Sequence, residues 1–215
     1  QWCDWDIPLH WGGVSDPFQP AEKIYKNSLK LMNIFKDANY PVIISTKGTS
    51  ILAQQEYLEV LKKMNVMVQI SAICKEYDKL DSGAPTFDQR MKDAIEISKN
   101  CKRLMIRCQP YNPVVFSNVL KNLKTFKEVG AYGVIFEGMK YKAKRPNTER
   151  HFGDFVFSKE LLKKQFSIFK DECHRLGLRF FSGENRLRPM SDDLCCCGTE
   201  GLEGFKVNKC NLNHK

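Results

Sequence analysis

Short apolar runs alternate along the chain with longer segments in which apolar residues recur every three or four positions. In the second half of the segment at residues 20–39, for example, one face of the predicted helix carries Leu31, Ile34, Phe35 and Ala38. The short runs predict strands at residues 7–11, 42–46, 66–73, 103–108, 133–136 and 178–182. The longer segments predict helices at residues 20–39, 50–64, 87–100, 114–129 and 158–176.

Strands that alternate with helices indicate an α/β fold whose parallel strands are joined by right-handed crossovers. Such a series forms either a closed barrel or an open doubly wound sheet, and both alternatives remain open at this point. The chain contains no internal repeat, low-complexity tract or linker. We therefore expect one domain over residues 1–184, followed by a polar, Cys-containing tail at 185–215 that packs on it.

Polar and small residues gather where the predicted strands end. In parallel α/β folds, ligands bind at these carboxyl ends. The candidates are Gly12, Gly13, Ser15, Asp16, Thr46, Lys47, Ser71, Arg107, Gln109, Tyr111, Glu137 and Glu184, with Arg90 early in the third helix. Each has an ordinary alternative as a turn or capping residue, with Asp16, Ser50 and Ser158 the clearest candidates for N-caps.

Three groups among these candidates suggest chemistry. Gly12 and Gly13 allow close approach of a ligand to the backbone, although no phosphate-binding glycine motif is present. Lys47 suits a carboxylate or phosphate. Glu137 and Glu184 are candidates for a general acid and base. The alternative is that they bind a ligand amine or pair with Arg107.

Composition agrees with one soluble globular domain. The chain has 215 residues, of which 42% are hydrophobic and 27% charged, with a formal charge of +9. No apolar stretch reaches the roughly 18 residues that a membrane span needs, and no signal peptide is recognisable. Because the chain begins at Gln1, we expect a processed or truncated product.

The nine cysteines do not form a disulfide pattern. Their number is odd, and several stand singly in apolar runs, namely Cys74, Cys101, Cys108 and Cys173. This usage favours a reducing, cytoplasmic compartment. The block Cys195, Cys196 and Cys197, with Cys210 following, leaves zinc, an iron–sulfur role or simple packing open.

The densest basic run follows the fifth predicted strand. It contains Lys140, Lys142, Lys144 and Arg145, with Tyr141 between them. Cations beside an aromatic ring are typical of nucleic-acid binding. The alternative is a solvated loop.

The order of several motifs resembles the radical S-adenosylmethionine (SAM) superfamily, and within it the spore photoproduct lyase-like group often labelled DNA repair photolyases. The resemblance rests on residues 10–22, 43–47, 84–85, 90, 107–113, 183–188 and 195–198. It implies a partial, TIM-barrel-like parallel β/α barrel of about six strands. It also implies SAM and a [4Fe-4S] cluster as cofactors. The expected reaction is reductive cleavage of SAM, by which the protein acts on an unknown substrate. A nucleic acid is the candidate substrate.

The resemblance also implies roles for individual residues. Cofactor binding would fall to Gly12, Gly13, Ser15, Asp16, Thr46, Lys47, Ser71, Arg90, Arg107 and Gln109. Catalytic roles would fall to Tyr111, Glu137 and Glu184, and nucleic-acid contacts to Lys140, Lys142, Lys144 and Arg145.

The chain departs from the family in one respect. The cluster-binding spacing C-x-x-x-C-x-x-C is not in the sequence, and we expect those ligands upstream of Gln1. The chain alone is therefore predicted to be inactive. Its open barrel edge is expected to pair with that segment or with another chain. The hydrogen-donating cysteine of the lesion-repairing lyases is also replaced, by Gly13 and Val14. The alternative function is a non-catalytic barrel remnant that binds nucleic acid or a partner protein.

Overall fold

The computed structural model describes residues 8–193 and 195–205. Its main sheet has six parallel strands, in the order β1 (Leu9–Trp11), β2 (Val42–Thr46), β3 (Val66–Ser71), β4 (Arg103–Tyr111), β5 (Gly133–Gly138) and β9 (Arg179–Ser182). The α/β class and the parallel sheet of the partial barrel are thus confirmed. Strand β3 is shorter than predicted and β4 is longer. Residue 7 of the first predicted strand lies outside the described residues.

The helices follow the predicted order, but two of the predicted segments are divided. The α-helices are α1 (Glu22–Tyr25), α2 (Asn27–Asp37), α3 (Thr49–Leu52), α4 (Gln55–Leu61), α5 (Phe87–Lys99), α6 (Phe116–Glu128) and α7 (Lys159–Arg175). Short 3-10 helices are η2 (Lys75–Lys79), η3 (Pro113–Val115) and η4 (Asn185–Met190).

The predicted helix over residues 20–39 is interrupted at Lys26, which adopts a left-handed conformation with φ of 50°. The carboxylate of Glu22 explains the break. It accepts hydrogen bonds from the backbone N–H groups of Ser28 and Leu29, both at 2.9 Å. A helix N-terminus has N–H groups without intrahelical partners, so this carboxylate starts a new helix there.

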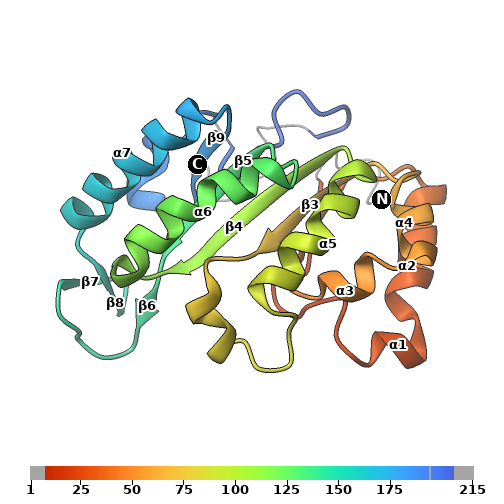
Figure 1. Ribbon diagram of the computed structural model, residues 1–215, viewed down its shortest axis with the longest axis horizontal. Coiled ribbons are helices and arrows are strands. Elements are labelled where there is room, and N and C mark those ends of the chain that lie inside the picture. The colour runs from red at the N-terminus through yellow and green to blue at the C-terminus, as the bar shows by residue number, and fades with distance from the viewer. Residues whose placement is uncertain (1–7, 194, 206–215) are drawn as a thin grey trace.

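The helices lie along one face of the sheet (Figure 1). The core beneath them contains the outward-facing strand residues and the apolar faces of the helices. Phe136 of β5 shows this packing, since its ring stacks on Phe169 of α7 at 4.5 Å and on Phe180 of β9 at 5.5 Å. Ser158 acts as the N-cap of α7, accepting a hydrogen bond from Leu161 N–H. None of the described helices has the length and apolarity to cross a membrane.

The other face of the sheet is covered at its amino end by the described part of the tail. One apolar side chain from each of five strands joins a second core there, which consists of Ile43, Met67, Met105, Ile135, Phe181 and Phe205. Arg103 fixes the tail by donating to the backbone carbonyl of Glu200 at 2.9 Å, while its guanidinium stacks 3.8 Å from the ring centre of Tyr132.

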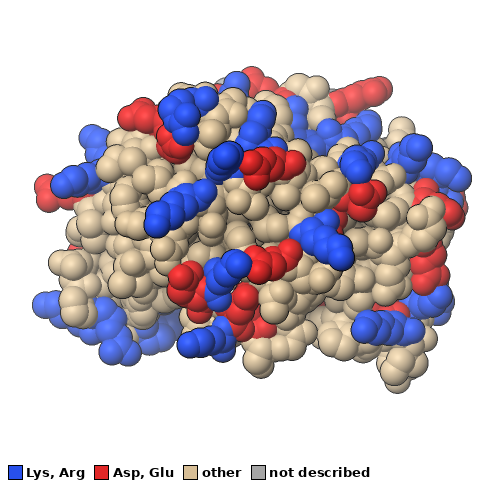
Figure 2. All heavy atoms as spheres, viewed as in Figure 1, with Lys and Arg blue, Asp and Glu red and all other residues tan. Residues whose placement is uncertain are grey.

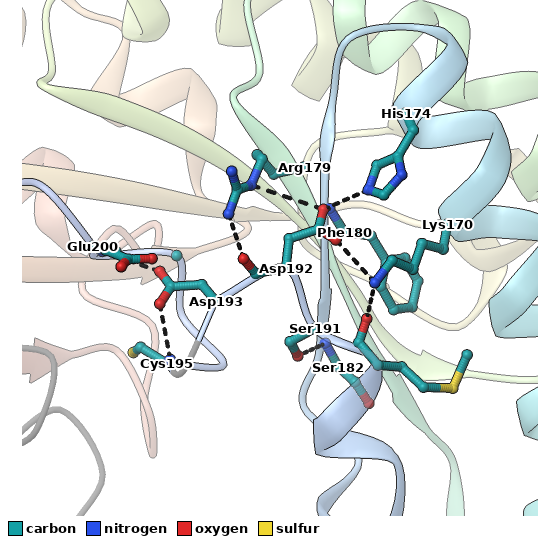
Figure 3. Close-up of polar contacts among 12 residues, drawn as sticks. Lys170, His174, Arg179, Phe180, Ser182, Ser191, Asp192, Asp193, Cys195 and Glu200 are labelled. Carbon is teal, nitrogen blue, oxygen red and sulfur yellow. Dashed lines mark hydrogen bonds and ion pairs between the residues drawn. The ribbon is translucent and has the colours of Figure 1, made fainter.

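Asp192 holds the start of the tail against β9 and α7 (Figure 3). Its carboxylate accepts a hydrogen bond from the backbone N–H of Phe180 at 2.7 Å. It also pairs with Lys170 at 3.0 Å and with His174 at 2.8 Å. The division of the chain at residue 184 into barrel and tail stays a prediction.

A small antiparallel sheet follows β5, where a basic loop was the alternative expectation. It consists of β6 (Lys140–Tyr141), β7 (Thr148–His151) and β8 (Asp154–Phe157), in the order β6-β8-β7. We call residues 140–157 the basic sheet. It projects at one end of the molecule, at the lower left of Figure 1. The first two residues of the basic run are therefore part of a strand rather than a loop.

Candidate functional site

The side chains on the tail-covered face of the sheet change from apolar to polar along each strand. Ile43 is followed two residues later by Ser45, Met67 by Gln69, and Met105 by Arg107. Because side chains alternate between faces with a period of two, each pair lies on the same face. The amino half of this face is thus filled by the second core, and the carboxyl half carries hydrogen-bonding groups.

A cavity of about 340 Å³ lies at this carboxyl end. Its walls contain eight of the ten residues predicted to bind the cofactor, which are Gly12, Gly13, Asp16, Thr46, Lys47, Ser71, Arg107 and Gln109. Ser45 and Pro110 complete the lining. The structure therefore brings the predicted residues together from four strand ends, while their role in binding stays a prediction. We call this space the carboxyl-end cavity.

The two adjacent glycines differ in what the fold demands of them. Gly12 has φ of +98°, and a Cβ atom there would lie 1.9 Å from the carbonyl oxygen of Ser45. No other residue fits, so packing alone explains Gly12. Gly13 would place a Cβ with no atom within 4 Å. Gly13 therefore leaves open space at the cavity, which a ligand could enter.

Asp16 organises the rim rather than capping a helix. Its carboxylate accepts hydrogen bonds from Thr46 Oγ1 at 2.7 Å, from the backbone N–H of Lys47 at 2.6 Å, and from the N–H of Phe18 at 2.9 Å. These bonds join the loop after β1 to the end of β2.

Lys47 and Arg90 meet at a shared carboxylate, that of Asp81. Arg90 donates to Asp81 Oδ2 at 2.9 Å, and Lys47 forms an ion pair with Asp81 Oδ1. Burial alone would raise the pKa of Asp81, but the hydrogen bonds from Lys47 and Arg90 outweigh it and hold that pKa below its usual value.

Arg90 is 3% exposed and does not line the carboxyl-end cavity. It also donates to the backbone carbonyls of Ser71 and Pro85, at 2.9 and 2.8 Å. Arg90 therefore lies behind the cavity wall, outside the lining that was expected to contain it.

A hydrogen-bonded chain that sequence reasoning missed crosses the inner face below the cavity. Ser45 Oγ donates to Gln69 Oε1 at 3.0 Å, and His10 Nε2 lies 2.7 Å from the same Oγ. Ser45 donates its single hydroxyl proton to Gln69, so His10 Nε2 is the donor in the hydrogen bond between His10 and Ser45 Oγ. Desolvation and the positive charge of Arg107 lower the pKa of His10, which favours this neutral donor. The signal for this chain in the sequence was the occurrence of polar residues at alternate positions of otherwise apolar strands.

Several buried polar atoms near the cavity have no hydrogen-bond partner among the described residues. They are Nε2 of Gln69, Nε of Arg107 and Oε1 of Gln109. Because an unsatisfied buried donor or acceptor costs about 1–3 kcal/mol, such atoms call for a partner. Of these residues Arg107 and Gln109 line the carboxyl-end cavity, which thus has one unpartnered donor and one unpartnered acceptor in its walls.

Tyr111 and Ser15 lie outside the cavity lining. The hydroxyl of Tyr111 donates to Gln165 Oε1 of α7 at 2.6 Å, and its ring packs on Phe136, Phe166 and Phe169. Tyr111 therefore belongs to the core under the helices and lies outside the cavity, where its catalytic role was expected. Ser15 is exposed and accepts a hydrogen bond from Gln19.

Glu137 and Glu184 lie near each other, while their role as a general acid and base stays a prediction. Both line a second, smaller cavity beside the first. Glu137 Oε2 lies 3.9 Å from Arg107 Nη2, so the expected pairing with Arg107 is also present.

The basic sheet carries the four predicted nucleic-acid contacts, two of which form ion pairs. Lys140 pairs with Glu137 at 3.1 Å and Lys142 with Asp154 at 2.6 Å. Lys144 and Arg145 are exposed in the turn between β6 and β7. Figure 2 shows basic side chains gathered at this end of the molecule.

The cysteine block lies with the tail at the amino end of the sheet, away from the carboxyl-end cavity. Cys197 packs on the second core, and the S atoms of Cys196 and Cys197 are 3.6 Å apart. Among residues 8–193 and 195–205, no group of three or more His, Cys, Asp or Glu side chains could hold a metal ion. Cys210 lies outside the described residues.

No protein-family model matches the sequence, and no curated protein matches it significantly. Solved structures do match its fold. A point mutant of spore photoproduct lyase has a TM-score of 0.60 at 12% identity, over 80% of this chain and 61% of that one. Streptococcus suis SuiB bound to S-adenosylmethionine has a TM-score of 0.56 at 12% identity, over 78% of this chain and 37% of that one.

A domain of pyruvate-formate lyase-activating enzyme from Bacteroides vulgatus has a TM-score of 0.57 at 13% identity, over 82% of this chain and 99% of that one. The chain thus spans less than two thirds of the lyase and of SuiB. At such low identity the likeness concerns the fold alone. The chain has the partial-barrel fold that these radical SAM enzymes share.

Proposed function

We propose that the carboxyl-end cavity binds S-adenosylmethionine and that the chain is the SAM-binding part of a radical SAM enzyme of the spore photoproduct lyase-like group. The observation that carries this is the convergence of eight predicted residues on one cavity. Its volume of about 340 Å³ lies within the range of about 300–1,000 Å³ usual for small-molecule sites.

The residues present fit the groups of SAM. Gln109 Oε1 is an unpartnered acceptor that suits an ammonium or an adenine amino group, and Arg107 Nε is an unpartnered donor that suits a carboxylate or hydroxyl. The open space at Gly13 lets a ligand reach the backbone. When bound with a reducing cluster, SAM supplies a 5′-deoxyadenosyl radical.

A [4Fe-4S] cluster has no fitting ligand set among the described residues, since none of the cavity-lining residues is a cysteine. In this proposal, the ligands of the cluster therefore lie outside residues 8–193 and 195–205. The chain's own contribution is to bind SAM, to orient it at the strand ends and to hold Lys47 and Arg107 at the cavity.

SAM binding by the purified chain, measured by isothermal titration calorimetry, tests the proposal. Gly13→Val adds a side chain where no atom lies within 4 Å, so the fold should be retained while the cavity is blocked. We expect at least tenfold weaker binding of SAM. Val14→Leu is the matched control, because Val14 is 106% exposed and does not line the cavity. Equal affinity of both variants for SAM, or no SAM binding by the unaltered chain, would overturn the proposal.

A second candidate function is binding of a nucleic acid by the basic sheet, either as the substrate of the enzyme or by a non-catalytic remnant. The gathering of Lys and Arg at this end of the molecule supports it (Figure 2). Phe152, at the turn between β7 and β8, is 95% exposed and lies 4.5 Å from the ring centre of His151. Exposed rings beside cations suit stacking on bases.

We also propose a strand partner at β1. Among the described residues β1 pairs only with β2, through Leu9 to Trp11. An edge strand of a parallel sheet can accept another strand. A segment of the same protein or another chain would extend the sheet there.

A further inference from the structure

A larger cavity, of about 580 Å³, lies beside the carboxyl-end cavity, and Asp16 and Lys47 line both. Three segments form it, which are residues 16–23 after β1, residues 47–51 after β2 and residues 82–85 before α5. At roughly 30 Å³ for each water-sized group, it has room for about 20 non-hydrogen atoms, enough for a fused aromatic ring system. We call this space the loop cavity.

The wall of the loop cavity is largely apolar. Each of the three segments contributes apolar side chains, which are Phe18, Pro20, Ile51, Ala84 and Pro85. An apolar wall with a few polar groups is typical of small-molecule sites. Contact with such a wall favours a ligand that has apolar surface to remove from water.

Hydrogen bonds fix the wall without any ligand. In the segment before α5, Ala84 N–H donates to the backbone carbonyl of Asp81 at 3.0 Å, and Arg90 Nε donates to that of Pro85 at 2.8 Å. Asp16 joins the other two segments through the bonds described above. A site that is formed before binding spends little binding free energy on ordering its own loops.

The charged groups around the loop cavity leave one cation over. Lys47 pairs with Asp81, which Arg90 also contacts, and the carboxylate of Asp16 lies in the wall. These two cations and two carboxylates balance one another. Lys23 is exposed and lines the cavity, and its ammonium has no ion pair or hydrogen bond within the described part of the chain.

Glu22, the neighbour of Lys23 in the chain, does not supply the missing anion. Its carboxylate is 5% exposed, does not line the cavity and accepts hydrogen bonds from Ser28, Leu29 and Tyr57. The flexible four-carbon stem of a lysine lets its ammonium follow a ligand at the rim. Lys23 can therefore meet an anionic group there.

We propose that the loop cavity binds an aromatic acid, with the ring system against the apolar wall and the anionic group at Lys23. Size and charge together favour this occupant. An uncharged ring leaves Lys23 without a partner, and a small inorganic anion leaves the apolar wall uncovered. Because Asp16 and Lys47 line both cavities, the bound acid lies next to the SAM site. That this acid is the substrate of a SAM-dependent reaction rests on the function proposed above, whereas its binding does not.

The test uses the fluorescent probe 8-anilinonaphthalene-1-sulfonate and its uncharged counterpart N-phenyl-1-naphthylamine, each titrated into the unaltered chain at pH 7. The sulfonate should bind more tightly than the uncharged probe. In Lys23→Met, the dissociation constant for the sulfonate should rise about two- to fivefold, which is the worth of one exposed ion pair, and that for the uncharged probe should not change. Pro20→Asp replaces an exposed apolar residue of the wall by a carboxylate and should weaken binding of both probes.

Lys62→Met is the matched control. It makes the same change in charge as Lys23→Met at an exposed position after α4 and does not line the cavity, so it should bind both probes as the unaltered chain does. Urea unfolding of each variant shows whether it folds, because the sulfonate also binds partly unfolded chains. Equal affinity of the unaltered chain for the two probes, or undiminished sulfonate binding by a folded Lys23→Met, would overturn the proposal. So would an equal loss in Lys62→Met, or undiminished binding of both probes by a folded Pro20→Asp.

SAM titration of the unaltered chain separates this proposal from the previous one. Binding of the sulfonate at Lys23 without SAM binding leaves the aromatic-acid site intact and removes its assignment to a SAM-dependent reaction. SAM binding without sulfonate binding overturns the aromatic-acid site and leaves the SAM site intact.

Discussion

The guanidinium of Arg90 donates to Asp81 at 2.9 Å in a place where the two side chains are only 4% and 11% exposed. Lys47 pairs with the other oxygen of the same carboxylate. Asp81 thus connects a residue of the cavity wall to one behind it. We therefore expect Arg90 to hold Asp81 where its carboxylate pairs with Lys47.

Arg90→Met should therefore destabilise the fold and loosen the cavity. It removes three hydrogen bonds and leaves Asp81 paired with Lys47 alone. Breaking a buried ion pair by deleting one partner costs about 3–5 kcal/mol. Urea unfolding should show a loss of this order. The control is Lys75→Met, which removes an exposed ion pair with Asp88 and should leave the free energy of unfolding nearly unchanged. Similar losses in the two variants would contradict the structural role of Arg90.

Asp192 should make the stability of the protein depend on pH in the acid range. Burial alone would raise the pKa of Asp192, but hydrogen bonds from Phe180 N–H, His174 and Lys170 outweigh it and lower that pKa. A depressed folded-state pKa contributes stability above the unfolded value, about 3.9 for Asp, and this stability is lost as the pH falls through the folded value.

Asp192→Asn should cost about 1.5–3 kcal/mol at pH 7, the usual worth of hydrogen bonds to a charged group. The difference in unfolding free energy from the unaltered chain should stay constant down to about pH 5 and shrink below about pH 4. Urea titrations between pH 7 and pH 2 measure it. Asp171→Asn, at an exposed position of α7, serves as the control and should follow the unaltered chain. A pH-independent difference for Asp192→Asn would refute this account.

Tyr111→Phe tests the placement of Tyr111 in the core. The variant keeps the ring contacts with Phe136 and Phe169 and loses the hydrogen bond to Gln165. We expect a loss of about 0.5–1.5 kcal/mol in unfolding free energy. Binding of SAM, measured by calorimetry, should be unchanged because Tyr111 does not line the cavity. Loss of SAM affinity in a stably folded variant would restore Tyr111 to the site.

Reversing the charge of the basic sheet should weaken binding of single-stranded DNA. In Lys144→Glu with Arg145→Glu, the slope of log affinity against log salt concentration should decrease by about 0.7 for each phosphate that the variant no longer neutralises. Lys62→Glu with Lys63→Glu makes the same change in net charge at exposed positions after α4 and should have little effect. Fluorescence anisotropy with a labelled oligonucleotide measures both. Equal losses in the two variants would mean that net charge, not the basic sheet, governs binding.

The sequence by itself determined the order of elements and the place of the cavity. Apolar strands alternating with amphipathic helices specify a parallel sheet, and parallel strands bring their carboxyl ends to one edge. Residues as distant as Gly12, Lys47 and Gln109 therefore meet, which follows from their positions after predicted strands alone.

Tertiary structure decided which of those side chains face the cavity. Tyr111 stands two residues after Gln109 and should share its face, but the register of β4 shifts between Cys108 and Tyr111. Such an irregularity reverses the alternation, and Tyr111 enters the core under the helices. Pro110 is the local signal for an irregularity here, because proline within a strand is found at bulges, but the resulting direction of Tyr111 depends on pairing with β5.

The remaining differences between the predicted and the observed structure have a similar cause. They arise from contacts between residues far apart in the sequence, or from contacts that override the local helical propensity. Glu22 ends one helical segment and starts the next by bonding to Ser28 and Leu29, against a continuous amphipathic pattern. Arg90 lies behind the wall because Asp81 and two backbone carbonyls surround it. Periodicity along the chain fixes which elements form and in what order. The partner of each buried charge is fixed only when the elements pack, since a charge buried without one is too costly to persist.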